Sequence, residues 1–267
     1  MNTAHVTVTN SASVLAFETT GSECNKIWDR FLTVEGKPAY HIGNVCGTCS
    51  FFFERLEGAN KSISPSEISN SLSQGLKHLD ESLLNKIKTI LPNGEYVTSL
   101  LEIFPSRVFP GSAKDYFTHE QVELWGIDGF WNLPHHPKTE YYRSRTKDLG
   151  ERRKLFEFII PMFPGNWLKP DECEAYKSDI SVGHQPTALA LTVLDIKGPA
   201  TWEGKPAVIE HWCLAHYLLD GHHKTFAASE VDKPITLLSF LSLGESLATE
   251  ENVSTLIDYL KSPPNNA

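Results

Sequence analysis

The sequence contains no run of 18 consecutive apolar residues, so we expect no transmembrane helix and no membrane partner. The segment from Met1 to Thr20 has no Lys or Arg and no long apolar core, so we expect no secretory signal there. Basic residues are outnumbered: 24 Lys and Arg stand against 33 Asp and Glu, which gives a net charge of −9. Because proteins bind nucleic acid through Lys and Arg that neutralise phosphates, we expect no nucleic-acid partner.

The one dense basic stretch runs from Arg143 to Lys154 and is interrupted by Asp148 and Glu151. We interpret it first as a solvated face or loop, and second as a site for an anionic ligand. With 267 residues, of which 40% are hydrophobic, the chain can form one large globular domain or two small ones.

Cysteine is scarce and is not spaced as a disulfide framework. The five cysteines are Cys24, Cys46, Cys49, Cys173 and Cys213. Their odd number, together with the absence of a secretory signal, indicates a reducing compartment, and we expect the protein to be cytoplasmic.

Cys46 and Cys49 form a C-x-x-C pair for which three interpretations stay open. Two cysteines are half of a tetrahedral zinc site, and His41, five residues upstream, is the candidate third ligand of a Zn²⁺ ion. Alternatively, the pair is a redox dithiol, because C-G-T-C resembles the thioredoxin-type active site, in which the first thiol has a lowered pKa. The third interpretation is a tight turn with two buried thiols.

Residues 1–160 are predicted to form an α+β region. We expect a hairpin from Phe31 to Ile42 that turns at Glu35-Gly36-Lys37. A helix should begin at Ser64-Pro65 and run to about Leu79, and Asp80 should cap a second helix. A strand is expected from Tyr96 to Phe104, and a capping box at Thr118 should open a short helix that ends at Trp125.

Residues 161–267 are predicted to form a second, α/β domain with a mixed sheet. Helices are expected over residues 170–180, 222–229 and 249–260, and strands over residues 187–196, 207–219 and 234–243. The strand at 187–196 has little polarity on either face, which is typical of a sheet covered on both sides. The fold class is therefore α/β at the C-terminal end and α+β overall.

Residues 126–142 are aromatic, proline-rich and irregular. Long loops in compact domains often carry binding residues, so we expect Trp131, His135, His136 and Tyr141 to contact a substrate. The alternative is a loop that packs on its own aromatic side chains.

The turn Asp220-Gly221-His222-His223-Lys224 is the densest group of chemically active side chains. A strand ends here and a helix begins, so free N–H groups, Gly221 and the Lys224 ammonium could form an anion site. His216 shares a strand face with Asp220, and seven of the eleven histidines lie between residues 135 and 223. We expect Asp220, His222, His223 and His216 to be catalytic, whereas the plainer alternative is that Asp220 only caps the helix.

The span from about Pro170 to Leu243 resembles the ParB/sulfiredoxin-like superfamily. The resemblance rests on the order helix, Gly-His-Gln-Pro-Thr connection (183–187), two strands, Gly-His-His-Lys turn (221–224), helix, and Lys-Pro-Ile leading into a last strand. It implies a mixed-sheet unit of that fold. It also implies that Gly221, His222, His223 and Lys224 contact the phosphates of a nucleotide such as ATP.

The resemblance leaves the first 160 residues unassigned. Two features of this sequence also depart from known members of the superfamily and exclude their functions. ParB proteins continue with a helix-turn-helix region. Here only 43 residues follow Lys224, and they are predicted to contain one strand and one helix, so we do not expect DNA partitioning. The sulfiredoxin nucleophile is a Cys in the turn, whose place is held here by His222. With these two functions excluded, the part of the superfamily that the sequence still resembles acts on small molecules and includes nucleotide-dependent kinases of free serine.

Three functions are therefore expected from the sequence. The first is a small-molecule enzyme, a nucleotide-dependent phosphotransferase, in which Asp220 holds Mg²⁺ or acts as the base. The second is a zinc-dependent lyase or hydrolase that uses His41, Cys46 and Cys49. The third is a non-catalytic nucleotide sensor with structural zinc. The sequence leaves the oligomeric state open.

Overall fold

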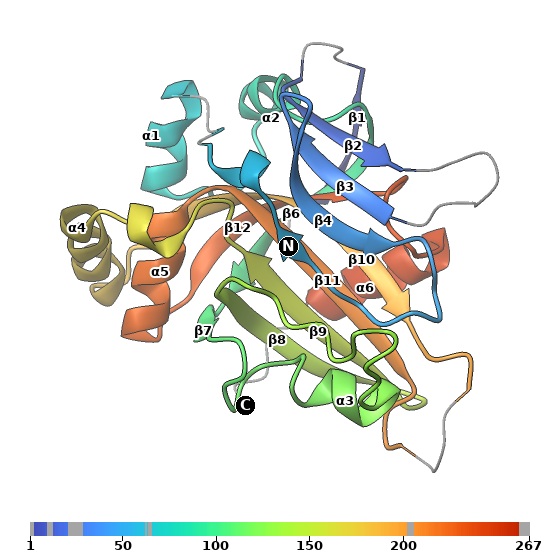
Figure 1. The fold of residues 1–267 in the computed structure, drawn as a ribbon. Coiled ribbons are helices and arrows are strands. Elements are labelled where there is room, and N and C mark those ends of the chain that lie inside the picture. Colours follow the sequence, from blue (N-terminus) through green and yellow to red (C-terminus); the bar gives the residue numbers. More distant parts are fainter. Residues whose placement is uncertain are drawn as a thin grey trace.

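The structure is a computed structural model that describes residues 3–9, 13–20, 29–61, 63, 66–201 and 206–261. Two β-sheets and the helices around them make up the fold (Figure 1). The elements are β1 (Thr3–Val8), β2 (Leu15–Thr19), β3 (Asp29–Val34), β4 (Lys37–Asn44), β5 (Glu54–Arg55), η1 (Glu57–Ala59), α1 (Ser66–Gln74), α2 (Glu81–Lys88), β6 (Gly94–Ile103), β7 (Ser106–Val108), α3 (Glu120–Trp125), β8 (Tyr141–Gly150), β9 (Arg153–Ile160), η2 (Gly165–Trp167), α4 (Pro170–Ser181), β10 (Thr187–Lys197), β11 (Glu210–Asp220), α5 (His222–Val231), β12 (Ile235–Ser242) and α6 (Glu250–Leu260).

The larger sheet has eight strands in the order β1-β6-β12-β10-β11-β9-β8-β7. The pairs β10–β12 and β11–β9 are parallel, and the other pairs are antiparallel, so the sheet is mixed. The smaller sheet has four strands in the order β2-β3-β4-β5. No helix in the described part of the chain is long and apolar enough to cross a membrane.

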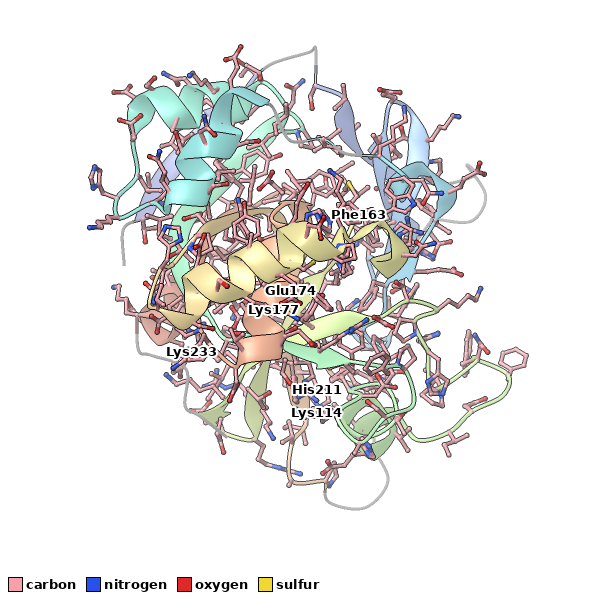
Figure 2. The ribbon with its side chains drawn as sticks, turned by 90° about the vertical axis from the view of Figure 1, so that its left-hand side faces the viewer. Lys114, Phe163, Glu174, Lys177, His211 and Lys233 are labelled. Atoms are coloured by element: carbon pink, nitrogen blue, oxygen red, sulfur yellow. A yellow bond between two sulfur atoms is a disulfide. The ribbon has the colours of Figure 1, made fainter. Side chains whose placement is uncertain are left out.

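Both faces of the central strands are buried. Along β10, Leu189, Leu191 and Val193 face the core that the large sheet shares with the small sheet, α1 and α2. The intervening Ala188 and Ala190 face a second core under α5 and α4, the helix that lies toward the viewer in Figure 2. Because each face has a hydrophobic cover, β10 is apolar along almost its whole length, as the sequence predicted.

Several predicted elements are confirmed. The hairpin of β3 and β4 turns at Glu35 and Gly36, both with positive φ, and the Asp80 carboxylate accepts the N–H of Leu83 to cap α2. β11 ends at Asp220 and α5 begins at His222, so the helix follows the strand directly.

Other expectations need correction. The helix expected to reach Leu79 ends at Gln74, because Gly75 turns the chain with φ +83° and packs against the backbone of Gln185. Ser64 and Pro65 lie outside the described residues. The capping box at Thr118 is wrong: His119 is the N-cap residue of α3, and the Thr118 hydroxyl donates to Asp115.

The stretch from Arg143 to Lys154 is not a solvated loop but belongs to the antiparallel pair β8 and β9. Arg145 is 2% exposed and lies against Glu157 of β9. The boundary expected at residue 160 falls within the large sheet, because β9 pairs with β11 and β6 pairs with β12. The α/β half therefore shares its sheet with strands from the first 160 residues.

Candidate functional site

The turn between β11 and α5 owes its shape to Gly221. Gly221 is the N-cap residue of α5 and has φ +95°, a backbone conformation that favours glycine. A Cβ atom there would stand 2.6 Å from the Cβ of Ala188 on β10. The glycine is therefore required for packing of the turn against the sheet, which is a different reason from the close approach of a ligand that the sequence suggested.

Lys224 and Asp220 form a buried ion pair beside this turn. Lys224 is 4% exposed, and its ammonium lies 3.0 Å from Asp220 Oδ1 and 3.0 Å from the carbonyl oxygen of Thr187. Burial lowers the pKa of Lys224, and the Asp220 carboxylate opposes this effect. Two of the three ammonium hydrogens thus bond to the protein, and Asp220 pairs with Lys224 instead of capping α5.

His222 and His223 each accept a backbone N–H from the connection between β9 and α4. His222 Nε2 accepts from Met162 N–H at 2.9 Å, and His223 Nε2 accepts from Lys169 N–H at 3.0 Å. Burial lowers the pKa of His222 to about 3, and burial also lowers the pKa of His223. Both rings are therefore neutral at pH 7 with the proton on Nδ1, and together they fix both ends of the segment from Met162 to Lys169.

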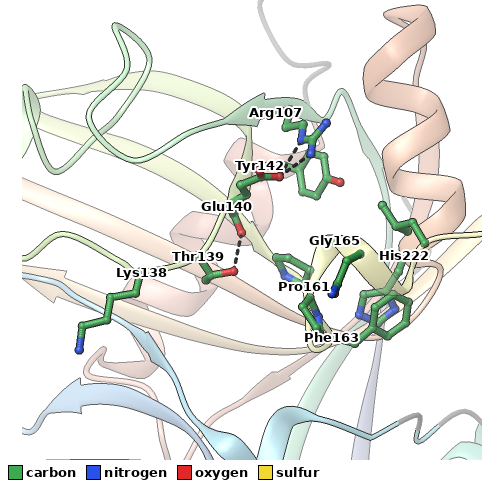
Figure 3. Close-up of a pocket in the computed structure, with 12 residues that line it drawn as sticks. Arg107, Lys138, Thr139, Glu140, Tyr142, Pro161, Phe163, Gly165 and His222 are labelled. Atoms are coloured by element: carbon green, nitrogen blue, oxygen red, sulfur yellow. Dashed lines mark hydrogen bonds and ion pairs between the residues drawn. The ribbon is translucent and has the colours of Figure 1, made fainter.

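A cavity of about 490 Å³ lies between this segment and the strands β7 and β8 (Figure 3). We call it the large cavity; it is lined by Arg107, Lys138, Thr139, Glu140, Tyr142, Pro161, Phe163, Pro164, Gly165, Asn166, Leu168 and His222. In Figure 3, Phe163 and His222 lie together on one side of the cavity, and Arg107, Glu140 and Tyr142 lie on another. The rings of Phe163 and His222 are stacked with centroids 3.7 Å apart.

Besides Lys138, which also lines the large cavity, Arg107 supplies positive charge there. Its Nε and Nη2 donate to Glu140 Oε2 at 2.9 and 2.5 Å. Its guanidinium lies 4.8 Å from the ring centroid of Phe109 and 5.2 Å from that of Phe226. Only one oxygen of Glu140 is used in these bonds, so the guanidinium is oriented but not enclosed.

A second cavity of about 200 Å³, the small cavity, lies on the other side of the turn. It is lined by Ser69, Ser73, Glu172, Tyr176, Asp220, Gly221, His223 and Lys224. The side chains come from α1, α4, the end of β11 and the start of α5, and the hydroxyls of Ser73 and Tyr176 are 2.9 Å apart. The turn predicted from the sequence is thus divided: Asp220, Gly221, His223 and Lys224 border the small cavity, and His222 borders the large one.

His216 is not part of either cavity. It is fully buried in the sheet, where Nδ1 lies 2.8 Å from Thr192 Oγ1 and Nε2 lies 3.2 Å from Glu157 Oε1. Burial would raise the pKa of Glu157, but Arg145 and His216 more than offset it and hold that pKa at about 2. His216 does share a strand face with Asp220, as predicted, but its bonds place it in a buried ionic network.

The predicted substrate residues of the aromatic loop line neither cavity, although His136 and Tyr141 both lie near Asp115. Trp131 is 66% exposed, whereas Tyr141 is fully buried and donates its hydroxyl hydrogen to Asp115. The ring of His135 packs on Phe52, and His136 Nδ1 lies 3.9 Å from Asp115 Oδ2. The loop instead reaches the large cavity with residues 138–140 and 142.

The three predicted zinc ligands do not form a ligand cluster in the described part of the chain. Cys46 and Cys49 are joined as a disulfide. His41 Nε2 lies 3.1 Å from Asp29 Oδ1, and the His41 ring stacks on Phe31. In the described part of the chain, no three His, Cys, Asp or Glu side chains are grouped so that they could hold a metal ion.

Sequence reasoning missed Arg107, Phe163 and the serines of α1. The partner of Arg107, Glu140, is 33 residues away, and the short strand β7 has no clear hydrophobic period. The only local signal is the two-residue spacing of Arg107 and Phe109.

The chain was compared with protein-family models, with curated proteins and with solved structures, and it matches none of them.

Proposed function

We propose that this protein binds a small organic anion in the large cavity, with phosphorylated compounds such as nucleotides as the first candidates. The observation that carries the proposal is a cavity of about 490 Å³ in which Arg107 and His222 face aromatic and proline side chains. This volume lies within the range of roughly 300–1,000 Å³ that is usual for small-molecule sites.

The lining supports a ligand with a flat ring and a negative charge. Phe163 and Tyr142 offer apolar surfaces for a ring, and the guanidinium of Arg107 offers donors for a carboxylate or phosphate. Because Nε2 of His222 already accepts a hydrogen bond, its Nδ1–H is a donor that does not change charge near pH 7. Such a neutral donor suits a ligand oxygen.

We further propose that residues 170–242 form a ParB/sulfiredoxin-like unit. The order α4, β10, β11, α5, β12 is the order that the resemblance implies, and the turn before α5 has glycine at its N-cap. The small cavity, at about 200 Å³, has room for a single phosphate group rather than a whole nucleotide. Ser69 and Ser73 would be donors to such a group.

Phosphoryl transfer is the enzymatic form of this proposal. It needs a divalent cation and a base, and Asp220 is the carboxylate at the turn that fits either role. In this structure Asp220 pairs with Lys224, so Mg²⁺ binding would require exchange of one cation for another. The two buried free thiols, Cys173 and Cys213, fit a cytoplasmic location.

Titration calorimetry with ATP, AMP and inorganic phosphate, each with and without Mg²⁺, tests the proposal. Arg107→Met should weaken binding of the anionic ligand about tenfold or more, since hydrogen bonds to charged groups contribute roughly 1.5–3 kcal/mol. Arg153→Met, which removes an arginine on β9 that lines neither cavity, is the matched control and should bind like the wild type. If no phosphorylated compound binds, or if Arg107→Met binds as tightly as the wild type, the proposal is wrong.

A further inference from the structure

The C-x-x-C turn that contains Cys46 and Cys49 is held from outside by hydrogen bonds to its carbonyl groups. The buried Lys197 ammonium donates to the carbonyl oxygen of Cys46 at 2.7 Å and to that of Asn44 at 3.2 Å. The N–H of Gly198 donates to Gly47 at 3.0 Å, and the Trp125 indole donates to Thr48 at 3.1 Å. The donors come from β10, from the residue after it and from α3, so the disulfide is not the only interaction that holds the turn.

The two sulfur atoms have different surroundings. Cys46 Sγ receives the N–H of Cys49 at 3.1 Å and lies 3.3 Å from the Thr48 hydroxyl. Such donors stabilise negative charge on the sulfur that receives them, so they favour a thiolate at Cys46 when the pair is reduced. Cys46 and Cys49 are both half-buried, and Gly47 and Thr48 between them are exposed, so another molecule can reach the turn.

We propose that Cys46 and Cys49 are an exchange-active dithiol/disulfide pair, with Cys46 as the nucleophile and an external disulfide as the substrate. The Cys46 thiolate attacks one sulfur of the external disulfide, which releases one thiolate and forms a mixed disulfide at Cys46. The Cys49 thiol then loses its proton to solvent and attacks Cys46 Sγ, which forms the Cys46–Cys49 bond and releases the second thiolate. Two electrons pass from the protein dithiol to the substrate, which leaves as two thiols after protonation.

A purely structural bridge would contribute less at this position than one that closes a long loop. The disulfide spans a sequence separation of 3, and so short a loop restricts the unfolded chain less than a longer one would. The other described cysteines behave differently: Cys173 and Cys213 are buried, and burial raises the pKa of both thiols. His41, the candidate third zinc ligand, instead contacts Asp29 and stacks on Phe31.

The first experiment equilibrates the full chain in buffers with defined ratios of reduced to oxidised dithiothreitol, followed by acid trapping, alkylation and peptide mass spectrometry. A Cys24→Ser background keeps a cysteine outside the described residues from competing. We expect the peptide with Cys46 and Cys49 to change reversibly between oxidised and reduced forms while the circular dichroism spectrum stays constant. A pair that is reduced only in denaturant would show a structural bridge and overturn the proposal.

The second experiment identifies the nucleophile. In the same background, Cys49→Ser leaves Cys46 alone and Cys46→Ser leaves Cys49 alone, so the two variants are matched. With 5,5′-dithiobis(2-nitrobenzoate) at pH 7, Cys46 should react at least tenfold faster than Cys49, and Thr48→Val should slow Cys46 severalfold. Equal rates for the two cysteines, or one tightly bound zinc ion per chain in elemental analysis, would overturn the proposal.

Discussion

At the scale of single residues, His222 and His223 make structural contacts that the sequence does not show. Both were expected to be catalytic because they start a helix after Gly221. Their Nε2 atoms accept N–H groups from residues 60 and 54 positions earlier in the chain. A local motif carries no information about such distant donors, and only the folded sheet brings Met162 and Lys169 within reach.

Gly221 allows a prediction at the same scale. Gly221→Ala should lower the free energy of unfolding by about 2–4 kcal/mol, because it adds backbone strain to overpacking against Ala188. Urea unfolding followed by circular dichroism measures the change.

Gly111→Ala is the matched control for this substitution. Gly111 has φ +80°, but a Cβ atom there meets no other atom within 4 Å, so only the strain of about 1 kcal/mol should remain. Equal losses for the two variants would show that Ala188 makes no contribution and that the φ angle alone requires glycine.

At the scale of helices and strands, continuous apolar segments were predictable and charged ones were not. β10 and β12 were expected close to their observed bounds, because burial on both faces leaves an apolar run in the sequence. β8 was not expected as a strand, because its sequence, Tyr-Tyr-Arg-Ser-Arg-Thr-Lys-Asp-Leu-Gly, is largely polar. Its Arg145 is buried only because Glu157 on the neighbouring strand compensates the charge, and strand pairing is not visible in the sequence.

The same limit applies to the candidate site. The turn from Asp220 to Lys224 was found from its own residues, but the large cavity is closed by Arg107 and the segment around Phe163. These segments are joined to the turn only by tertiary packing. The C-x-x-C pair was found as well, but the contacts that bear on its three interpretations, among them those of His41, are visible only in the fold.

The strand pairing predicts how fragments behave. In residues 161–267 alone, β11 lacks β9 and β12 lacks β6, so both outer edges of the remaining three strands lose their partners. We expect this fragment to be unfolded or aggregated, as measured by circular dichroism and size-exclusion chromatography. It should become structured when it is produced together with residues 1–160. A fragment that folds alone, with cooperative thermal unfolding, would show that the C-terminal half is an independent domain.

At the scale of the whole molecule, buried neutral histidines tie stability to pH. Burial lowers the pKa values of His211 and His222 to about 3 in the folded protein, whereas an unfolded His titrates near 6.5. The unfolded state therefore binds more protons between these values, so the stabilising effect is complete above pH 6.5 and is lost as pH falls toward 3. Well below pH 6.5, each of these two histidines should lower the free energy of unfolding by about 1.4 kcal/mol for each unit by which the pH falls.

Urea unfolding at pH 7, 6, 5 and 4.5 checks this dependence, and His222→Gln separates the contribution of one ring. A glutamine amide can accept the Met162 N–H without titrating, so the slope below pH 6 should fall by about 1.4 kcal/mol per pH unit. His5→Gln, at an exposed position on β1, is the control and should keep the wild-type slope. The carboxylates are the same in the wild type and in both variants, so the difference between their slopes reports on His222, and Glu157, with a pKa of about 2, loses its contribution mainly at lower pH. A wild-type stability that is constant from pH 7 to 4.5 would contradict the neutral state of both histidines, and an unchanged slope in His222→Gln would contradict it for His222.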